Sequence, residues 1–198
     1  MLLIVGAGEV GEAVGKAGLQ SGYKVHATTR SQEKATHLEK MGFHPVLLPG
    51  TNEEETGETL KELCAKSAIV YSIPPQAKGQ DQFWLDLIYG SAAASDQTRV
   101  YISSTAVYET SSRDINESTA IDTTNLSPWG KNRLEAENLW RFVGGNIIRV
   151  SAFYGPSPDR SMPWWRLRQD ARKWAELALI SFIWKTLLKW FCKQCGWK

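Results

Sequence analysis

A glycine-rich segment near the start of the chain constrains the fold more than any other feature. Gly6, Gly8 and Gly11 are spaced as G-x-G-x-x-G, directly after the apolar run 2–5 and at the start of a stretch with helical periodicity. This context predicts a strand, a tight turn and a helix whose first backbone N–H groups are free to bind phosphate. The alternative interpretation is a strand-to-helix turn without a ligand.

The first 158 residues repeat this alternation. Runs of four to six apolar residues, many of them β-branched, are typical of strands buried on both faces. Their alternation with helix-length stretches predicts right-handed crossovers and a doubly wound parallel α/β sheet of the Rossmann type. The expected strands are 2–5, 24–29, 45–48, 68–73, 99–103 and 146–150, the expected helices are 9–21, 32–41, 53–65, 80–94 and 130–142, and a polar loop is expected over 109–128.

In a fold of this class the first turn holds the pyrophosphate of a dinucleotide. Gly6 permits the tight turn, Gly8 lets the backbone approach the pyrophosphate, and Gly11 lets the helix pack closely on the strand. Glu9 and Val10 lie between these glycines and belong to the same predicted site.

The fourth apolar run ends in a second group of predicted cofactor contacts. Ser72, Ile73 and Pro74 follow it at the edge of the sheet where the cofactor is expected, so their backbone is a candidate contact. Alternatively, Pro74 and Pro75 serve only as a rigid exit from the strand.

The end of the second expected strand bears on the choice of cofactor. NAD sites usually carry an acid there, which accepts from the ribose 2′-hydroxyl, but this chain has Arg30 and Ser31. A guanidinium can pair with a 2′-phosphate, and the serine can add a hydrogen bond, so the sequence favours NADP(H) over NAD(H). The alternative is that Arg30 is a solvated loop charge, with Glu33 near enough to pair with it.

Three further segments carry a resemblance to a known family. Residues 100–108 are similar to its S-S-x-x-V-Y-G strand, 148–156 to its R-x-x-x-x-Y-G-P strand, and 130–137 lie where it has its Y-G-x-S-K-x-x-x-E helix. The chain thus resembles the short-chain dehydrogenase/reductase superfamily, in its extended branch of nucleotide-sugar epimerases and dehydratases. The resemblance implies an NAD(P)-dependent protein that acts on a sugar nucleotide or a small carbonyl compound.

The resemblance also implies a catalytic serine, tyrosine and lysine, of which this chain keeps one. Ser104 stands at the serine position, but Trp129 replaces the tyrosine and Arg133 replaces the lysine, where the family holds the nicotinamide ribose. An indole cannot exchange a proton near neutral pH, and an arginine cannot tune a proton relay. The pattern is similar to the atypical subgroup, whose members bind NADP but keep the active-site residues poorly.

Two functions follow from this departure. The first is an NADP(H)-binding epimerase/dehydratase/reductase-like protein with weak or no catalysis. The second is a non-catalytic NADP(H) sensor that signals occupancy to a partner protein. Tyr108, Asp114 and Tyr154 are candidates for a substitute acid or base, although a structural role is favoured for each.

Cysteine, histidine and charge usage restrict the setting. Three cysteines are too few and too badly spaced for a secreted disulfide framework, which favours a reducing, cytoplasmic compartment. Cys64 fits the core, and the isolated pair Cys192 and Cys195 lacks the second pair that a zinc site needs. The three histidines are scattered, and no apolar stretch reaches the length of a membrane span. The net charge of +2 says nothing useful about partners, because basic residues are concentrated at the end of the chain. We expect no metal, no nucleic acid and no membrane contact.

The last part of the chain, 159–198, differs in composition from the rest. Residues 161–198 contain six of the nine tryptophans and eight Lys or Arg against two Asp or Glu. One interpretation is a basic amphipathic helix lying on a membrane surface. We favour another, in which a frameshift between about Arg172 and Ile180 replaced the family's C-terminal substrate domain. Back-translation in a shifted frame gives text similar to that of the family, so the tail is not expected to be a native domain.

Overall fold

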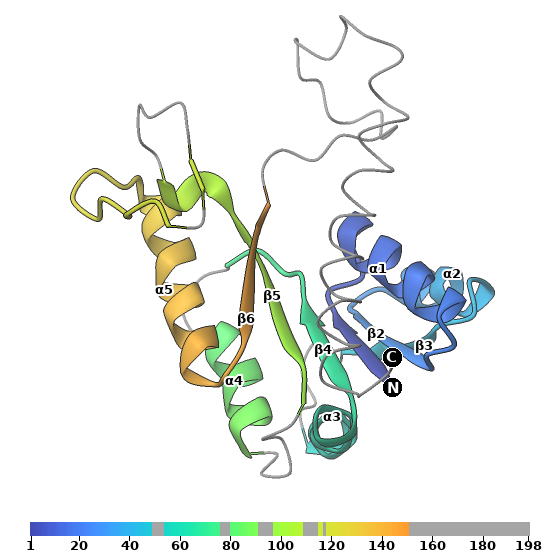
Figure 1. The fold of residues 1–198 in the computed structure, drawn as a ribbon. Coiled ribbons are helices and arrows are strands. Elements are labelled where there is room, and N and C mark those ends of the chain that lie inside the picture. Colours follow the sequence, from blue (N-terminus) through green and yellow to red (C-terminus); the bar gives the residue numbers. More distant parts are fainter. Residues whose placement is uncertain (49–53, 76–79, 91–96, 109–114, 117, 151–198) are drawn as a thin grey trace, which may run out of the picture. The chain divides into compact units, whose positions relative to one another are not determined.

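Six parallel strands form one sheet in the order β3-β2-β1-β4-β5-β6 (Figure 1). The structure is a computed structural model that describes residues 1–48, 54–75, 80–90, 97–108, 115–116 and 118–150. The strand order reverses between β1 and β4, and in folds of this class the carboxyl ends of these two strands are where a ligand crevice is expected. The predicted doubly wound α/β fold is confirmed. The strands are β1 (Leu2–Val5), β2 (Val25–Thr29), β3 (His44–Leu47), β4 (Ala68–Tyr71), β5 (Arg99–Ser104) and β6 (Asn146–Val150).

Helices cover both faces of this sheet (Figure 1). α1 (Glu9–Gln20) and α2 (Gln32–Lys40) pack on β1, β2 and β3. The other face carries an aromatic-rich core in which the buried rings of Tyr101 and Trp140 stack with their centroids 5.7 Å apart. Its helices are α3 (Glu54–Lys66), α4 (Gln80–Gly90) and α5 (Pro128–Phe142), and a short 3₁₀ helix, η2 (Thr105–Tyr108), follows β5.

The expected strands and helices agree with the structure to within a few residues, with three differences. The outer strands β3 and β6 are only partly buried, so the prediction of strands buried on both faces holds for β1, β4 and β5 but is wrong at the edges. An edge strand has one neighbour, and less of the helical layer covers it. The η2 turn was not predicted, and α5 begins at Pro128, inside the expected polar loop.

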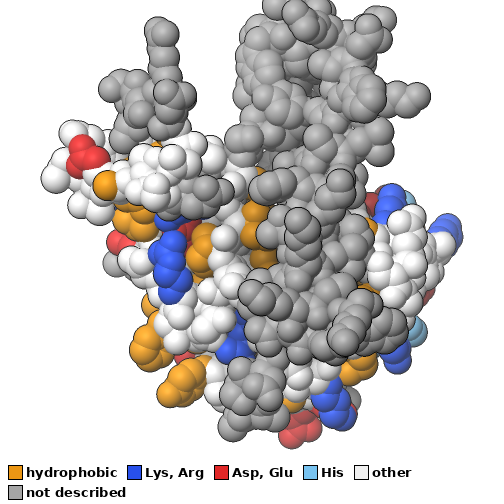
Figure 2. Space-filling view, viewed as in Figure 1, with side chains coloured by type: hydrophobic (Ala, Val, Ile, Leu, Met, Phe, Trp, Pro, Cys, Tyr) orange, Lys and Arg blue, Asp and Glu red, His pale blue; other side chains and the backbone are white. Residues whose placement is uncertain are grey.

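Exposed aromatic side chains gather where α4 and α5 end. Tyr89 of α4 is 70% exposed and Phe142 of α5 is 79% exposed, and their rings stack with centroids 6.3 Å apart. Figure 2 shows hydrophobic side chains at the lower left, over these two helices. Among the helices described, none combines the length and the apolar character that crossing a membrane requires.

Candidate functional site

The β1–α1 turn has the geometry that its sequence predicts. Gly6 lies in the left-handed region with φ +93°, a conformation that L side chains rarely adopt. Its N–H donates to Thr28 Oγ1 at 3.0 Å, and the next amide, of Ala7, donates to the Thr28 carbonyl at 3.2 Å. Thr28, at the end of β2, therefore fixes the turn from the neighbouring strand. No local pattern in the sequence marks Thr28 for this role.

The two later glycines meet different surroundings. A Cβ added to Gly11 would lie 2.2 Å from the carbonyl oxygen of Gly6 and 2.9 Å from Ile4 Cγ2, so only glycine lets α1 approach β1 this closely. A Cβ added to Gly8 would meet no atom within 4 Å. Gly8 is also the N-cap of α1, and no side chain caps this helix end. The first N–H groups of α1 thus have no intrahelical acceptor and no side-chain cap, as an N-terminus that binds a phosphate group requires.

The end of β4 supports the same turn from its other side. Ser72 Oγ donates to the Gly6 carbonyl at 2.6 Å, and the Ser72 amide donates to the Val5 carbonyl at 2.9 Å. Ile73 lies so close to Gly6 that a Cβ there would be 2.6 Å from Ile73 Cγ1. Ser72 and Ile73 are half-buried and Pro74 is exposed. The structure therefore brings these three residues beside the glycine turn, with the Ser72 hydroxyl occupied in holding it.

At the end of β2, Arg30 extends into solvent. It is exposed, and it makes no hydrogen bond or ion pair with the described residues, including the exposed Glu33. Ser31 is the N-cap of α2, and its Oγ accepts from the Lys34 amide at 3.3 Å. Its hydroxyl hydrogen remains available to a ligand.

A cluster of charges that the sequence analysis missed lies between α1 and α2. Glu12 is in the first turn of α1, where the helix dipole stabilises a carboxylate. The same carboxylate would repel a phosphate bound at this helix end. Lys34 forms an ion pair with Glu12, and His37 Nε2 lies 3.7 Å from its other oxygen. The Lys34 ammonium offsets the charge of Glu12. Glu9, also in the first turn, is exposed, and Val10 is half-buried.

The residues predicted for the reaction end of the site lie on β5 and α5. Ser104 is the last residue of β5, is half-buried, and its Oγ accepts from the Ala106 amide at 3.2 Å. Trp129, in the first turn of α5, is 49% exposed. The Arg133 guanidinium lies over its ring, 5.1 Å from the centroid, and is itself 8% exposed. Arg133 Nη1 lies 3.4 Å from both Tyr101 Oη and the Ile102 carbonyl oxygen, which places it beside the second half of β5.

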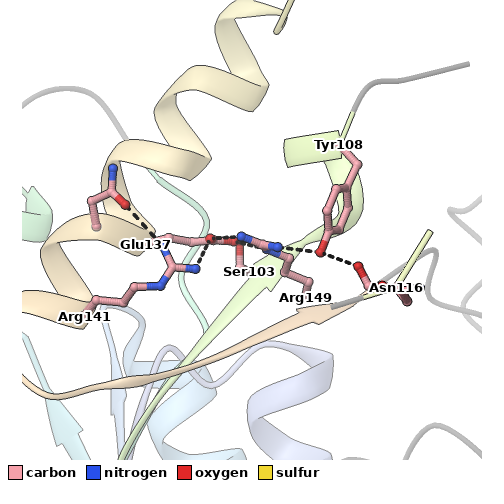
Figure 3. A network of polar contacts seen from close by, with 7 residues as sticks. Ser103, Tyr108, Asn116, Glu137, Arg141 and Arg149 are labelled. Carbon is pink, nitrogen blue, oxygen red and sulfur yellow. Dashed lines mark hydrogen bonds and ion pairs between the residues drawn. The ribbon is translucent and has the colours of Figure 1, made fainter. Parts of the chain in front are cut away.

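A buried polar network stands behind this end of the site (Figure 3). Glu137 of α5 is fully buried and accepts from Ser103 Oγ at 2.7 Å, from Arg149 Nε and Nη2 at 2.9 and 2.7 Å, and from Arg141 Nη2 at 2.9 Å. Burial by itself raises the pKa of Glu137, but the hydrogen bonds from Arg149, Ser103 and Arg141 outweigh it and hold that pKa below its usual value. The sequence signal for this network was a pair of opposite charges, Glu137 on an expected helix and Arg149 on an expected strand.

Tyr108 belongs to this network and not to an open site. Its hydroxyl accepts from Arg149 Nη1 and donates to the Asn116 carbonyl at 3.2 Å, and Arg149 also lies over its ring. The structural role favoured for Tyr108 is therefore confirmed. The other candidate acids, Asp114 and Tyr154, lie outside the described residues, as do Cys192, Cys195 and the tail.

Cys64 fits the core, as predicted. It is 1% exposed in α3, and burial raises the pKa of its thiol to about 12. Within the part of the chain that the structure describes, no three His, Cys, Asp or Glu side chains come together as metal ligands would.

Neither a protein-family model nor a curated protein matches the chain. Solved structures do. An NAD-dependent epimerase/dehydratase structure from Methylobacillus flagellatus, described as putative, is 22% identical with a TM-score of 0.59 over 78% of this chain and 55% of its own. A yeast methylglyoxal/isovaleraldehyde reductase complexed with NADPH is 17% identical with a TM-score of 0.57 over 79% and 59%. A short-chain dehydrogenase/reductase superfamily protein from Agrobacterium tumefaciens with bound NAD is 22% identical with a TM-score of 0.57 over 78% and 49%.

The chain has the fold of a short-chain dehydrogenase/reductase. The resemblance inferred from the sequence motifs is thus confirmed in the arrangement of the backbone, and the chain spans about half the length of these structures. In the short-chain dehydrogenase/reductase fold the β1–α1 turn and the end of β5 open on the same edge of the sheet, because carboxyl ends of parallel strands share one edge. The predicted cofactor residues at the ends of β1 and β4 and Ser104 at the end of β5 therefore lie on the same edge of the sheet.

Proposed function

We propose that the chain binds NADP(H) across the carboxyl edge of its sheet. The observation that carries this proposal is the uncapped N-terminus of α1 at Gly8, in a turn that Thr28 of β2 holds, with the exposed Arg30 two residues after Thr28. The pyrophosphate lies over Gly6, Gly8 and Gly11, where free N–H groups and the positive end of the helix dipole stabilise it. Glu9 and Val10 border the same turn, and the backbone of Ser72, Ile73 and Pro74 lines it from the side of β4.

The preference for NADP(H) over NAD(H) rests on Arg30. Its guanidinium has no ionic partner among the described residues, so no existing pair has to break when a 2′-phosphate arrives. Ser31 supports the same contact, because its hydroxyl can donate to the phosphate while it accepts from the Lys34 amide. The related folds occur with both NADPH and NAD, so this preference depends on the residues of this chain.

For the reaction, the site supports an epimerase/dehydratase/reductase-like protein with weak or no turnover. Ser104 faces the nicotinamide and Arg133 lies near its ribose. Trp129 stands at the proton-exchanging position, and an indole N–H donates but does not exchange a proton near neutral pH. Loss of a general acid–base group lowers a rate by about 10² to 10⁴. The substrate class is a sugar nucleotide or a small carbonyl compound.

A second candidate, a non-catalytic NADP(H) sensor, is favoured by the exposure of Trp129. An indole that is 49% exposed beside the crevice suits contact with a partner protein better than proton transfer. Turnover of any carbonyl or sugar-nucleotide substrate would favour the first function. Tight NADPH binding without turnover, with a nucleotide-dependent partner, would favour the second.

We also propose that the chain divides into a cofactor domain, 1–158, and a tail, 159–198, that replaces a substrate domain. The protein is proposed to be cytoplasmic. The composition of the tail supports this division. Sequencing the DNA between codons 172 and 180 tests it. An intact reading frame, with the same tail in near relatives, would show that the tail is genuine, and loss of liposome binding on deleting 174–198 would then support a membrane role.

The cofactor assignment is tested by fluorescence titration with NADPH and NADH on the wild type and on Arg30→Ala. We expect NADPH to bind at least 10-fold more tightly than NADH, and Arg30→Ala to remove that difference. Lys40→Ala, which deletes an exposed cation at the far end of α2, is the matched control and should change neither affinity. Equal binding of the two nucleotides, or an unaffected Arg30→Ala variant, would overturn the assignment to the 2′-phosphate.

A further inference from the structure

Arg133 carries a buried positive charge for which the described part of the chain provides no anion. The residue is 8% exposed, and its two hydrogen bonds go to the uncharged oxygens of Tyr101 and Ile102, both at 3.4 Å. Its Nε is buried without any hydrogen-bond partner. No carboxylate of the described residues lies within ion-pair distance of it. A guanidinium carries a positive charge, and Arg133 has only two long hydrogen bonds to neutral oxygens and the Trp129 ring to offset the burial of that charge.

Arg149 of β6, whose side chain is 16% exposed, has an anionic partner in the same part of the fold. Its Nε and Nη2 both bind the carboxylate of Glu137, at 2.9 and 2.7 Å, and its Nη1 binds Tyr108. The two arginines share a helix–strand layer, and only Arg149 has an anion. An uncompensated buried charge is costly, and such groups are found where a ligand completes them.

Arg133 lies close to solvent, because its neighbour Trp129 is partly exposed. Its guanidinium lies 5.1 Å from the centre of the Trp129 ring, which is 49% exposed. Both residues belong to the first half of α5, whose N-terminus carries the positive end of the helix dipole. Ser104, the last residue of β5, is two residues beyond Ile102, which Arg133 contacts. An anion at Arg133 would therefore lie beside the expected reaction end of the site.

We propose that Arg133, covered by Trp129, is a binding site for the carboxylate or phosphate group of a second, anionic ligand. This inference rests on the proposed function and names the class of its substrate or effector: an acidic carbonyl compound or a phosphorylated one, and not a neutral one. Arginine suits this task because its planar N–H groups match the oxygens of either anion. The same chemistry is present in the pyrophosphate of the cofactor, so the experiment has to separate these two sources.

The test is calorimetric titration of the full chain with inorganic phosphate, acetate and the neutral acetamide, each with and without saturating NADPH. We expect phosphate and acetate to bind and acetamide not to bind. Arg133→Met should weaken both anions at least 10-fold with saturating NADPH as well as without it, and Arg133→Lys should keep most of the anion affinity. Lys131→Gln removes an exposed charge two residues away and should leave binding nearly unchanged.

Thermal unfolding in the absence of anions distinguishes an arginine that binds a ligand from one that stabilises the fold. Because Arg133→Met removes an uncompensated buried charge, its Tm should equal or exceed that of the wild type. A fall of several degrees, or failure to fold, would show that Arg133 is structural and overturn the proposal. So would unchanged anion binding in Arg133→Met.

Two further outcomes separate the sources of the anion. If phosphate and NADPH exclude each other, and Arg133→Met weakens both, the arginine serves the cofactor and the second ligand is ruled out. If NADPH fails to bind at all, the proposed function fails. The nucleotide-free titrations then decide the anion site alone, since loss of phosphate binding in Arg133→Met would still support it.

Discussion

Arg149 of β6 donates two hydrogen bonds to the fully buried carboxylate of Glu137, from Nε at 2.9 Å and from Nη2 at 2.7 Å (Figure 3). Ser103 of β5 donates to the same carboxylate at 2.7 Å. One buried charge thus joins α5 to the last two strands of the sheet. Because β6 is an edge strand with little buried surface of its own, this contact fixes its position beside the site.

We expect Arg149→Met to destabilise the chain by about 3 kcal/mol, because it leaves the Glu137 carboxylate buried without its main cation. Urea unfolding measures the change. Arg141→Met is the matched control: its side chain is 45% exposed and donates one hydrogen bond to Glu137, so its effect should stay below about 1 kcal/mol. Equal effects of the two variants would contradict a special role for Arg149.

Alanine substitutions at Gly11 and Gly8 should affect stability and NADPH binding, respectively. A Cβ at Gly11 would lie 2.2 Å from the Gly6 carbonyl oxygen, so Gly11→Ala is expected to cost about 1–3 kcal/mol of stability by overpacking. Gly8 has an ordinary extended conformation, φ −78°, and free space around its Cα. Gly8→Ala should therefore fold like the wild type, with a matching urea midpoint. Its methyl group occupies the approach to α1, so NADPH should bind at least 10-fold more weakly. If Gly8→Ala binds NADPH normally, the pyrophosphate lies elsewhere.

Much of the fold could be predicted from the sequence because its signals are local. Periodicity placed the strands and helices, and the G-x-G-x-x-G spacing placed the turn that the structure finds at Gly6. Partial burial of β3 and β6 could not be predicted, because strand order decides which strands lie at the edge. The η2 turn was missed because Thr105–Tyr108 contains no glycine or proline that would mark a turn in the sequence.

The contacts within the site depended on pairs distant in the sequence. Thr28 accepts from Gly6 across 22 residues, and Lys34 pairs with Glu12 across the same separation. The pattern of one sequence does not show which of several charged residues will form an ion pair. Arg133 was placed by its motif, but its lack of an anion among the described residues is visible only once its neighbours are known.

The stacked pair of His26 and His44 should make stability depend on pH. Their ring centroids are 5.1 Å apart. The pKa of His26 is lowered, first by burial and then by the positive charges of His44, Lys24 and the N-terminus. The unfolded chain therefore binds a proton here more readily than the folded one. Its contribution is fully present above the ordinary value of about 6.5 and is lost as the pH falls below it.

We thus expect the wild-type Tm to fall between about pH 7.5 and 5.5, and His26→Gln to reduce that fall. Scanning calorimetry at a series of pH values measures both slopes. His37→Gln serves as the comparison, since that imidazole is on the surface of α2 with its side chain 54% exposed. A His26→Gln variant with the wild-type slope would mean that another group causes the dependence.

Ser31 permits a test of cofactor choice that leaves the fold intact. Its Oγ caps α2 by accepting from the Lys34 amide, so Ser31→Ala should cost about 1 kcal/mol of stability. Ser31→Asp keeps an acceptor at the cap and should unfold like the wild type. Its carboxylate, however, would repel a 2′-phosphate at Arg30 while accepting a hydrogen bond from a ribose 2′-hydroxyl. We expect NADPH to lose at least 10-fold in affinity and NADH to lose nothing, measured by fluorescence titration. Parallel losses of both nucleotides would show that Ser31 acts on the turn as a whole, whereas unchanged NADPH binding would place the 2′-phosphate away from this end of β2.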